Sequence, residues 1–198
     1  MKVVNGFNCC LADFCIWYNL DMVLSERINE YVKNSMIRGV LAGWKKNNLF
    51  VYITPITAQI SDKNFYYEEI KRAMVSWNEV LKKSNINTVF VITENPAEAD
   101  IVIHWTKVGR VFEGMCKYLS VIGDEIKKVS IEVGLENEYS GKNTTNESIF
   151  FVMMHEFGHS LGLGHGVDAD DVMYVPHQKN ISVPSENDLF VLKKIYQS

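Results

Sequence analysis

Three of the protein's five histidines lie within one eleven-residue segment, which reads His155-Glu156-Phe157-Gly158-His159-Ser160-Leu161-Gly162-Leu163-Gly164-His165. This segment constrains the fold more than any other, because the fold must bring these side chains together if they act as one site. If the chain is helical as far as Ser160 or Leu161, His155 and His159 lie on one helix face with Cβ atoms about 5–6 Å apart. A single metal ion can then take one ring nitrogen from each at about 2.0–2.1 Å.

A third ligand requires the chain to turn, because the face that carries the first two histidines offers no third position near the ion. Gly162 is placed to end the helix, since glycine adopts the left-handed backbone conformation without a Cβ penalty. Gly164 adds freedom, and His165 can then return toward the metal. The spacing therefore predicts three ligands, His155, His159 and His165, around one zinc ion whose fourth position is open, as in catalytic zinc sites.

Glu156 directly follows the first of these histidines, so on a helix it projects about 100° away from that ligand. We therefore expect it beside the metal ion and not bound to it. A carboxylate in that place can accept a proton from water and later give it to a departing amine. The plain alternative is a buried helix with incidental histidines. Gly162, the third histidine and the downstream Met173 argue against that alternative.

Composition indicates one globular domain. The chain has 198 residues, of which 47% are hydrophobic and 22% charged. A net charge of −4 argues against a nucleic-acid or anionic-membrane partner. No run of eighteen apolar residues is present, so no membrane span is predicted.

The four cysteines do not form a disulfide framework, because three of them crowd the N-terminus. Free thiols are the first expectation, and a bond from one of the three to the fourth is the alternative. The residues are Cys9, Cys10, Cys15 and Cys116.

Residues 1–44 are predicted to form an N-terminal helical segment, either a docking extension or a pro-region. The apolar run of Met1–Leu20 resembles a signal peptide, but polar residues interrupt it and no clear cleavage site follows. From Leu20 to Arg38 apolar residues recur at helical spacing, with Gly39 beyond the last turn. A sharper hypothesis is that a cysteine of this segment blocks the zinc, although the Pro-Arg-Cys-Gly motif of the known latency switch is absent.

Residues 45–198 read as an α+β catalytic domain. A long helix is expected from Ser61 or Asp62 through Leu81, a helix carrying the first two histidines should begin with a capping box of Thr144 and Glu147, and a terminal helix should begin at Ser185. His104 is expected to be a core or interface residue and not a ligand. The expected strands are Leu49–Ile53, Thr88–Thr93, Asp100–Trp105, Met115–Val121 and Val129–Val133, the last two joined by a turn at Gly123 and Asp124.

The chain resembles the metzincin zinc endopeptidases, and within them the matrixins. The histidine segment follows the pattern H-E-x-x-H-x-x-G-x-x-H that precedes a Met-turn in metzincins. Further likeness lies in Arg72–Val80, Ala99–Val102, Asp171–Tyr174 and the helix that begins at Asn187–Leu189. The resemblance implies a mixed, twisted sheet packed on the long helix and the zinc-binding helix, with a C-terminal helix, and it implies an extracellular location.

The resemblance also assigns individual residues. Met173 would be the Met-turn residue, an apolar base beneath the ligating rings. Tyr174 follows it directly, as in matrixins, and Val175 stands where astacin-like relatives have a tyrosine ligand. Gly166 departs from the residues usual after the third histidine. No structural-zinc or calcium loop is recognisable between Lys107 and Glu132, so one zinc per chain is predicted.

Protein or peptide substrates are implied for a monomeric enzyme. A substrate would lie extended along the edge strand Met115–Ser120. Its P1′ side chain, the first after the scissile bond, would enter a pocket bounded by the zinc helix and by Tyr174, Val175, Pro176 and His177, with Phe151 limiting the depth.

The predicted function is zinc-dependent endopeptidase activity, in which zinc polarises the carbonyl and Glu156 serves as general base and then as proton donor. Two alternatives remain open. One is a non-catalytic zinc-binding pseudoenzyme, which the intact Glu156 disfavours. The other is a narrow-specificity peptidase that acts on one partner bound by the N-terminal segment.

Overall fold

The computed structural model of the chain describes residues 26–60, 62–109, 113–137, 144–176 and 181–197. Residues 26–34 are helical, and within these described ranges three strands, a helix, four strands and two helices follow. They are β1 (Met36–Ile37), β2 (Val40–Leu41), β3 (Asn48–Ile53), α2 (Lys63–Lys83), β4 (Val89–Ile92), β5 (Ile101–Gly109), β6 (Gly114–Ile122), β7 (Glu125–Asn137), α3 (Asn146–Ser160) and α4 (Glu186–Tyr196). This arrangement confirms the α+β fold predicted from the sequence.

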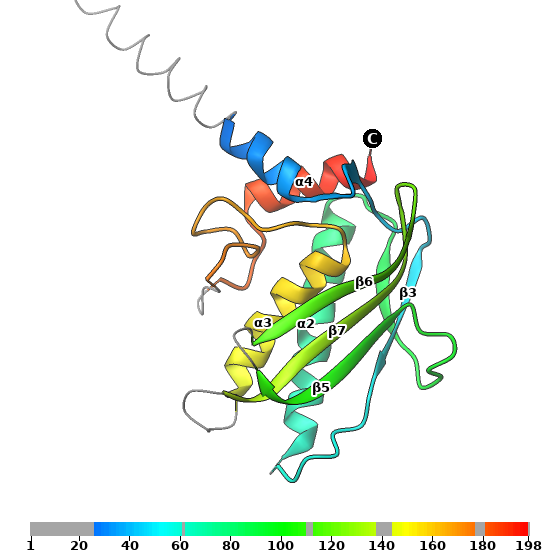
Figure 1. The fold of residues 1–198 in the computed structure, drawn as a ribbon, viewed down its shortest axis with the longest axis vertical. Coiled ribbons are helices and arrows are strands. Elements are labelled where there is room, and N and C mark those ends of the chain that lie inside the picture. Colours follow the sequence, from blue (N-terminus) through cyan, green and yellow to red (C-terminus); the bar gives the residue numbers. More distant parts are fainter. Residues whose placement is uncertain (1–25, 61, 110–112, 138–143, 177–180, 198) are drawn as a thin grey trace, which may run out of the picture.

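A five-stranded sheet in the order β4-β3-β5-β7-β6 forms the framework. Neighbouring strands are parallel except for β6, which runs antiparallel to β7 and lies at the edge. The helices α2 and α3 lie side by side against one face of this sheet (Figure 1). The tight turn at Gly123 and Asp124 joins β6 to β7, as predicted, and Gly123 adopts the positive φ that such turns favour.

The core lies between the sheet and the two helices. Alternate residues of the strands face it, so that Leu49 and Val51 of β3 are both fully buried. Trp77 of α2 links α2 to α3, because its indole Nε1–H donates to the carbonyl oxygen of Met154 in α3 at 2.8 Å. Phe157 of α3 contacts Phe90 of β4, with ring centroids 4.7 Å apart. This packing fixes the position of the helix that carries the first two histidines.

The predicted start of α2 near Ser61 or Asp62 is confirmed, whereas the predicted capping residue of α3 is wrong by one position. The cap of α3 is Thr145, whose side chain accepts from the backbone N–H of Ser148, whereas Thr144 donates its hydroxyl to the carbonyl oxygen of Gly134. The cap of α2 is Asp62, but Asp62 has a left-handed backbone and makes no side-chain capping bond. By contrast, Ser185 and Asp188 form a complete capping box at the start of α4.

The predicted helix through Arg38 is also wrong. The helix ends at residue 34, and residues 36–41 form a two-stranded hairpin whose turn is Arg38 and Gly39, both with positive φ. Helical spacing continued in the sequence past the true end, but the arginine-glycine pair favours a turn. The part of the segment before residue 26, with Cys9, Cys10 and Cys15, lies outside the described residues, and Cys116 is a free thiol.

His104 is exposed on β5, so the expectation of a core position is wrong. Its strand is buried only on alternate residues, Ile101 and Ile103, which face the helices. None of the helices within the described ranges is long and apolar enough to cross a membrane.

The N-terminal helix and hairpin pack on the rest of the domain. Tyr31 is fully buried, and its hydroxyl donates to the Asp188 carboxylate of α4 at 2.5 Å. Trp44 is also buried, and its Nε1–H donates to the carbonyl oxygen of Ser160 at the end of α3 at 2.7 Å. Figure 1 shows the N-terminal helix beside α4. Residues 26–44 therefore contribute to the same core as the histidine helix.

Removal of residues 1–44 is expected to destabilise the domain strongly. The fragment 45–198 lacks two buried aromatic side chains, and loss of each costs roughly 3–5 kcal/mol. The sum is comparable with the whole free energy of unfolding of an ordinary domain. Urea unfolding of the fragment beside the full chain measures the difference, and equal midpoints would show that the segment is dispensable for the fold.

Candidate metal centre

The helix α3 places His155 and His159 one turn apart and ends at Ser160. Gly162 then turns the chain with a φ of 101°, a conformation that other residues rarely adopt. A Cβ atom at Gly162 would also lie 2.3 Å from the carbonyl oxygen of Ala42. The turn predicted at this glycine is thus required by two independent constraints, and it brings His165 back toward the helix.

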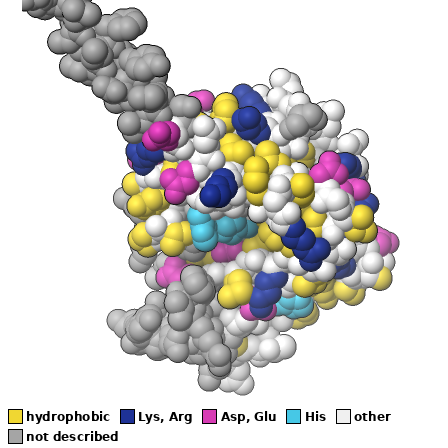
Figure 2. Space-filling view, turned by 45° about the horizontal axis from the view of Figure 1, so that its top comes forward, with side chains coloured by type: hydrophobic (Ala, Val, Ile, Leu, Met, Phe, Trp, Pro, Cys, Tyr) yellow, Lys and Arg dark blue, Asp and Glu magenta, His cyan; other side chains and the backbone are white. Residues whose placement is uncertain are grey.

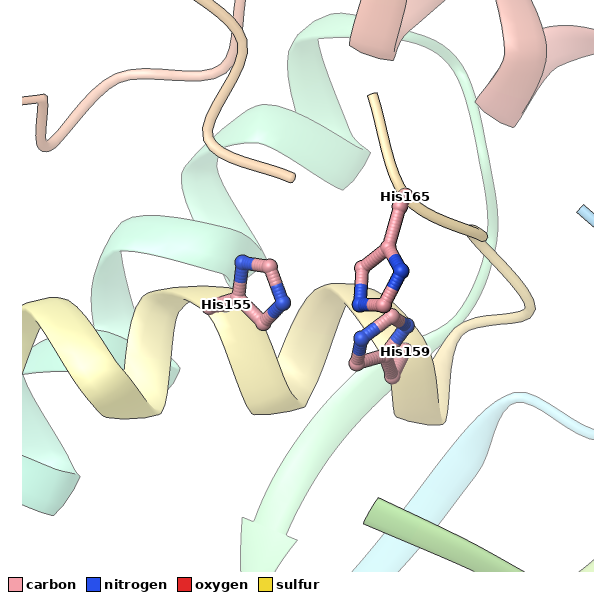
Figure 3. A group of neighbouring side chains, drawn as sticks. All are labelled: His155, His159 and His165. Atoms are coloured by element: carbon pink, nitrogen blue, oxygen red, sulfur yellow. The ribbon is translucent and has the colours of Figure 1, made fainter. Parts of the chain in front are cut away.

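The three histidine rings face one another (Figure 3). Their centroids are 4.6 Å apart for His155 and His159, 5.6 Å for His155 and His165, and 5.0 Å for His159 and His165. One potential ligand atom from each lies within 4.8 Å of the other two, which is a group that can hold a metal ion. Within the described ranges, it is the one group of three or more such residues.

Backbone carbonyl groups set the orientation of two of these rings. The Nδ1 atom of His155 lies 2.9 Å from the carbonyl oxygen of Val172, and that of His159 lies 2.7 Å from the carbonyl oxygen of Leu163. Because a carbonyl oxygen can only accept, each Nδ1 must carry the proton. Each Nε2 then keeps its lone pair for a metal, as in other histidine metal sites.

Burial lowers the pKa of His165, which favours its neutral form. The sequence-predicted trio is therefore together in space with the protonation that metal binding needs. Its side chains are buried, half-buried and exposed in the order His155, His159, His165, so the site opens toward solvent on the side of the third histidine. A cluster of histidine side chains reaches the surface in the middle of the face drawn in Figure 2, with hydrophobic side chains on both sides.

Met173 packs beneath the helix and is fully buried. A Cβ atom on Gly158 would lie only 2.2 Å from the Met173 sulfur, so this contact depends on glycine. The methionine therefore lies against α3 at Gly158, the residue that precedes His159, and its role as an apolar base beneath the three rings stays a prediction.

Two aspartates hold the turn that contains this methionine, and sequence reasoning did not find that role. The Asp171 carboxylate accepts from the backbone N–H groups of Val167 and Asp168 at 2.9 and 2.8 Å. The Asp188 carboxylate accepts from the backbone N–H of Val172 at 2.8 Å. The only signal in the sequence was Asp188 as part of a helix cap, which says nothing about its second partner.

Glu156 is 2% exposed and borders a cavity of about 220 Å³ together with the three rings. Its Oε2 atom has no hydrogen-bond partner in the described part of the chain. Burial raises the pKa of its carboxyl group to about 8, and the backbone N–H of Cys116 opposes that rise. The residues that border the cavity are Gly114, Met115, Cys116, His155, Glu156, His159, His165 and Val175.

This donor set fits a zinc ion. Three neutral imidazoles supply nitrogen ligands of the type that zinc prefers, and the unpaired carboxylate oxygen gains a partner when a cation and its water are present. Gly114 of β6 is needed for this arrangement, because a Cβ atom there would lie 2.8 Å from the Glu156 Oε1 atom. Burial and the neighbouring Glu156 raise the pKa of the Cys116 thiol well above its ordinary value, so this cysteine does not compete as a thiolate ligand.

The residues predicted for a substrate pocket are dispersed. Val175 borders the cavity, whereas Phe151 does not and instead packs edge-on against Phe150 with centroids 5.4 Å apart. Tyr174 is half-buried and Pro176 is exposed, and neither belongs to the bordering set. His177 lies outside the described residues.

Comparison with known proteins agrees with this geometry. The matrixin family model matches residues 43–197. Neutrophil collagenase from Homo sapiens is 27% identical over 160 residues, which cover 77% of this chain and 33% of that protein. Matrix metalloproteinase-27 from Tupaia belangeri is 30% identical over 171 residues, which cover 79% of this chain and 31% of that protein. The chain thus spans about a third of the length of these relatives.

The chain belongs to the matrixin family of zinc metalloendopeptidases. Membership confirms the resemblance drawn from the histidine segment and implies zinc as the metal.

Substitution of Gly158 by alanine is expected to destabilise the protein, although alanine is favoured over glycine by about 1 kcal/mol inside a helix. The new methyl group must displace the Met173 side chain, and overpacking of a core costs typically 1–3 kcal/mol. Urea unfolding measures the sign of the change. A net gain in stability would show that the methionine moves aside freely.

Zinc analysis of the purified chain is expected to give one ion per molecule. His159→Ala should lose that ion, because two remaining imidazoles hold zinc far more weakly than three. His104→Ala is the matched control, since His104 lies exposed on β5 and outside the metal group, which consists of His155, His159 and His165. This variant should keep the ion. Equal zinc contents in the two variants would contradict the ligand assignment.

Proposed function

We propose that this chain is a zinc-dependent endopeptidase in which His155, His159 and His165 hold the metal and Glu156 transfers the proton. One observation carries the proposal. Glu156 is buried with an unpaired carboxylate oxygen at the cavity that the three rings share. A buried carboxyl group with an oxygen that lacks a hydrogen-bond partner is unfavourable for folding, and such a group is found mainly where a site uses it.

The roles follow from the placement of each group. When bound, zinc supplies a Lewis acid that polarises the scissile carbonyl and acidifies water. The Glu156 carboxylate takes the proton from the attacking water and delivers it to the nitrogen of the departing amine, so that its own charge is restored at the end of the cycle. The backbone N–H of Cys116 keeps this carboxylate in place at the cavity.

The edge strand β6 supports the binding of an extended peptide. Its edge opposite β7 has no neighbouring strand among the described residues, so its backbone groups are open to a peptide. The start of β6 at Gly114–Cys116 borders the cavity that contains Glu156. A peptide paired with this strand would thus pass its backbone directly over the metal group.

The side of the cavity nearest Val175 is the proposed P1′ position. Val175 lies two residues after Met173 and is 45% exposed, so its side chain forms part of the rim of the cavity. Met115 of β6 borders the same cavity from the opposite element. These two side chains favour an apolar residue after the scissile bond.

Glu156→Ala is expected to keep zinc and to lose at least a hundredfold in kcat/KM, because removal of a general acid-base group typically costs 10²–10⁴-fold. Cleavage of casein and of a peptide library, each with and without a chelator, measures activity, and metal analysis measures zinc. Glu156→Gln keeps the volume of the side chain and controls for packing. Chelator-sensitive turnover that persists in both variants would refute the assigned role.

The same assay separates the alternatives. A pseudoenzyme binds zinc but cleaves no peptide in the library. A peptidase devoted to one partner cleaves few sequences, whereas a general endopeptidase cleaves many that share an apolar P1′ residue.

A further inference from the structure

A second cavity, of about 430 Å³, lies directly beside the metal group. It shares Cys116, His159 and His165 with the cavity that contains Glu156. Its opposite wall is residues 34–37, where the N-terminal helix ends and the β1–β2 hairpin begins. The matrixin match begins at residue 43, so this wall comes from a part of the chain outside the family region.

The wall is fixed to the loop that carries the third histidine. The backbone N–H of Gly164 donates to the Ser35 hydroxyl oxygen at 2.8 Å, and the Asn34 amide donates to the carbonyl oxygen of His165 at 3.2 Å. A Cβ atom on Gly164 would lie 2.1 Å from the carbonyl oxygen of Asn34, so the two backbones are in direct contact. The cavity therefore has a defined shape.

The surface of the second cavity is mixed, with apolar side chains on the hairpin wall and the histidines His159 and His165 on the side of the metal site. Three of its other polar side chains are already engaged: Ser35 and Asn34 as above, and Tyr118 through its hydroxyl, which donates to the carbonyl oxygen of His159 at 2.5 Å. Met36 and Ile37 are apolar and face it from the hairpin. None of the described residues that border it is an acid, a lysine or an arginine. Such a surface accepts a large uncharged side chain and rejects a charged one.

The two cavities follow one another along β6. Residues 114–116 border the first cavity, and Cys116 and Tyr118 border the second. Side chains two residues apart on a strand point to the same face, so Cys116 and Tyr118 mark successive positions along one line. If the P1′ residue occupies the first cavity and the peptide runs antiparallel to β6, the residues before the scissile bond pass the second.

We propose that the second cavity binds a large apolar side chain of the substrate two or three residues before the scissile bond, and that Met36 of the hairpin is a determinant of this specificity. The inference rests on the proposed peptidase function and adds a substrate preference to it. The occupant is the substrate itself, because the cavity is continuous with the metal group through three shared residues.

Two variants of the hairpin test the proposal. Met36 and Val40 are each 43% exposed and lie on its two paired strands, but only Met36 borders the cavity. The selected position is the substrate residue, two or three places before the scissile bond, whose side chain the second cavity binds. Met36→Asp should lower kcat/KM about tenfold for peptides with leucine, methionine or phenylalanine at that position, and should raise the relative cleavage of peptides with lysine there. Val40→Asp should leave both values unchanged. Met36→Ala serves as a milder variant, and thermal unfolding verifies that all three are folded.

Cleavage of a randomised peptide library by zinc-loaded full-length protein, with sequencing of the products, gives the preference at each position. An enriched large apolar residue two or three places before the bond, lost in Met36→Asp and kept in Val40→Asp, supports the proposal. Absence of any preference there, or an equal effect of both aspartate variants, overturns it.

Binding separates this inference from the peptidase assignment. A fluorescent peptide with leucine at the selected position, or a leucine-scanned peptide set if nothing is cleaved, is titrated into Glu156→Gln protein with and without Met36→Asp. Weaker binding caused by Met36→Asp supports the cavity even if the wild-type chain cleaves nothing, in which case the peptidase function alone fails. Unchanged binding, or no binding of any peptide, overturns the proposed role of the second cavity in substrate binding.

Discussion

Two hydrogen bonds from imidazole to backbone carbonyl oxygen decide what the histidine group can do. In the neutral rings of His155 and His159 they place the proton on Nδ1 and the lone pair on Nε2, and one potential ligand atom of each lies within 4.8 Å of that of His165. The carbonyl groups of Val172 and Leu163 are themselves held by the turns that follow α3, so the site depends on tertiary structure well beyond its helix. This explains why the aspartates at positions 171 and 188, which touch no metal ligand side chain in the described contacts, hold the frame in which those ligands lie.

The sequence was most informative where chemistry and geometry coincide. The i, i+4 histidines, the glycine turn and the third histidine required one arrangement, and the strands and long helices had clear periodicity. It was least informative where a residue's role depends on a distant partner. Thr144 reads as a helix cap but bonds Gly134, and His104 has apolar neighbours in sequence yet faces solvent. Nothing local signals that Cys116 borders the metal group, because β6 reaches α3 only in the folded chain.

The N-terminal segment illustrates the same difficulty at a larger scale. Its apolar residues have helical spacing, and the sequence alone leaves open whether they cover the site or support it. The contacts of Tyr31, Ser35 and Trp44 show that residues 26–44 support the fold, since each of the three bonds a residue or backbone group in the C-terminal half of the chain. Glycines at positions 162 and 164 allow this close approach, and both also belong to the histidine segment. Gly162 is therefore needed both for the turn that positions the third histidine and for the packing of the N-terminal segment, and Gly164 is needed for that packing.

The open edge of β6 has a consequence for behaviour in concentrated solution. An unpaired strand that receives a peptide can equally pair with the edge of another molecule, and exposed Leu119 and Ile122 add apolar surface to that risk. The irregular register between Tyr118 and Val121 interrupts the ladder midway. Only the stretch before it, about 17 Å long for five residues, remains straight enough for regular pairing. This irregularity thus limits the part of the edge that can pair regularly to the length of a short peptide, which disfavours self-association into extended sheets.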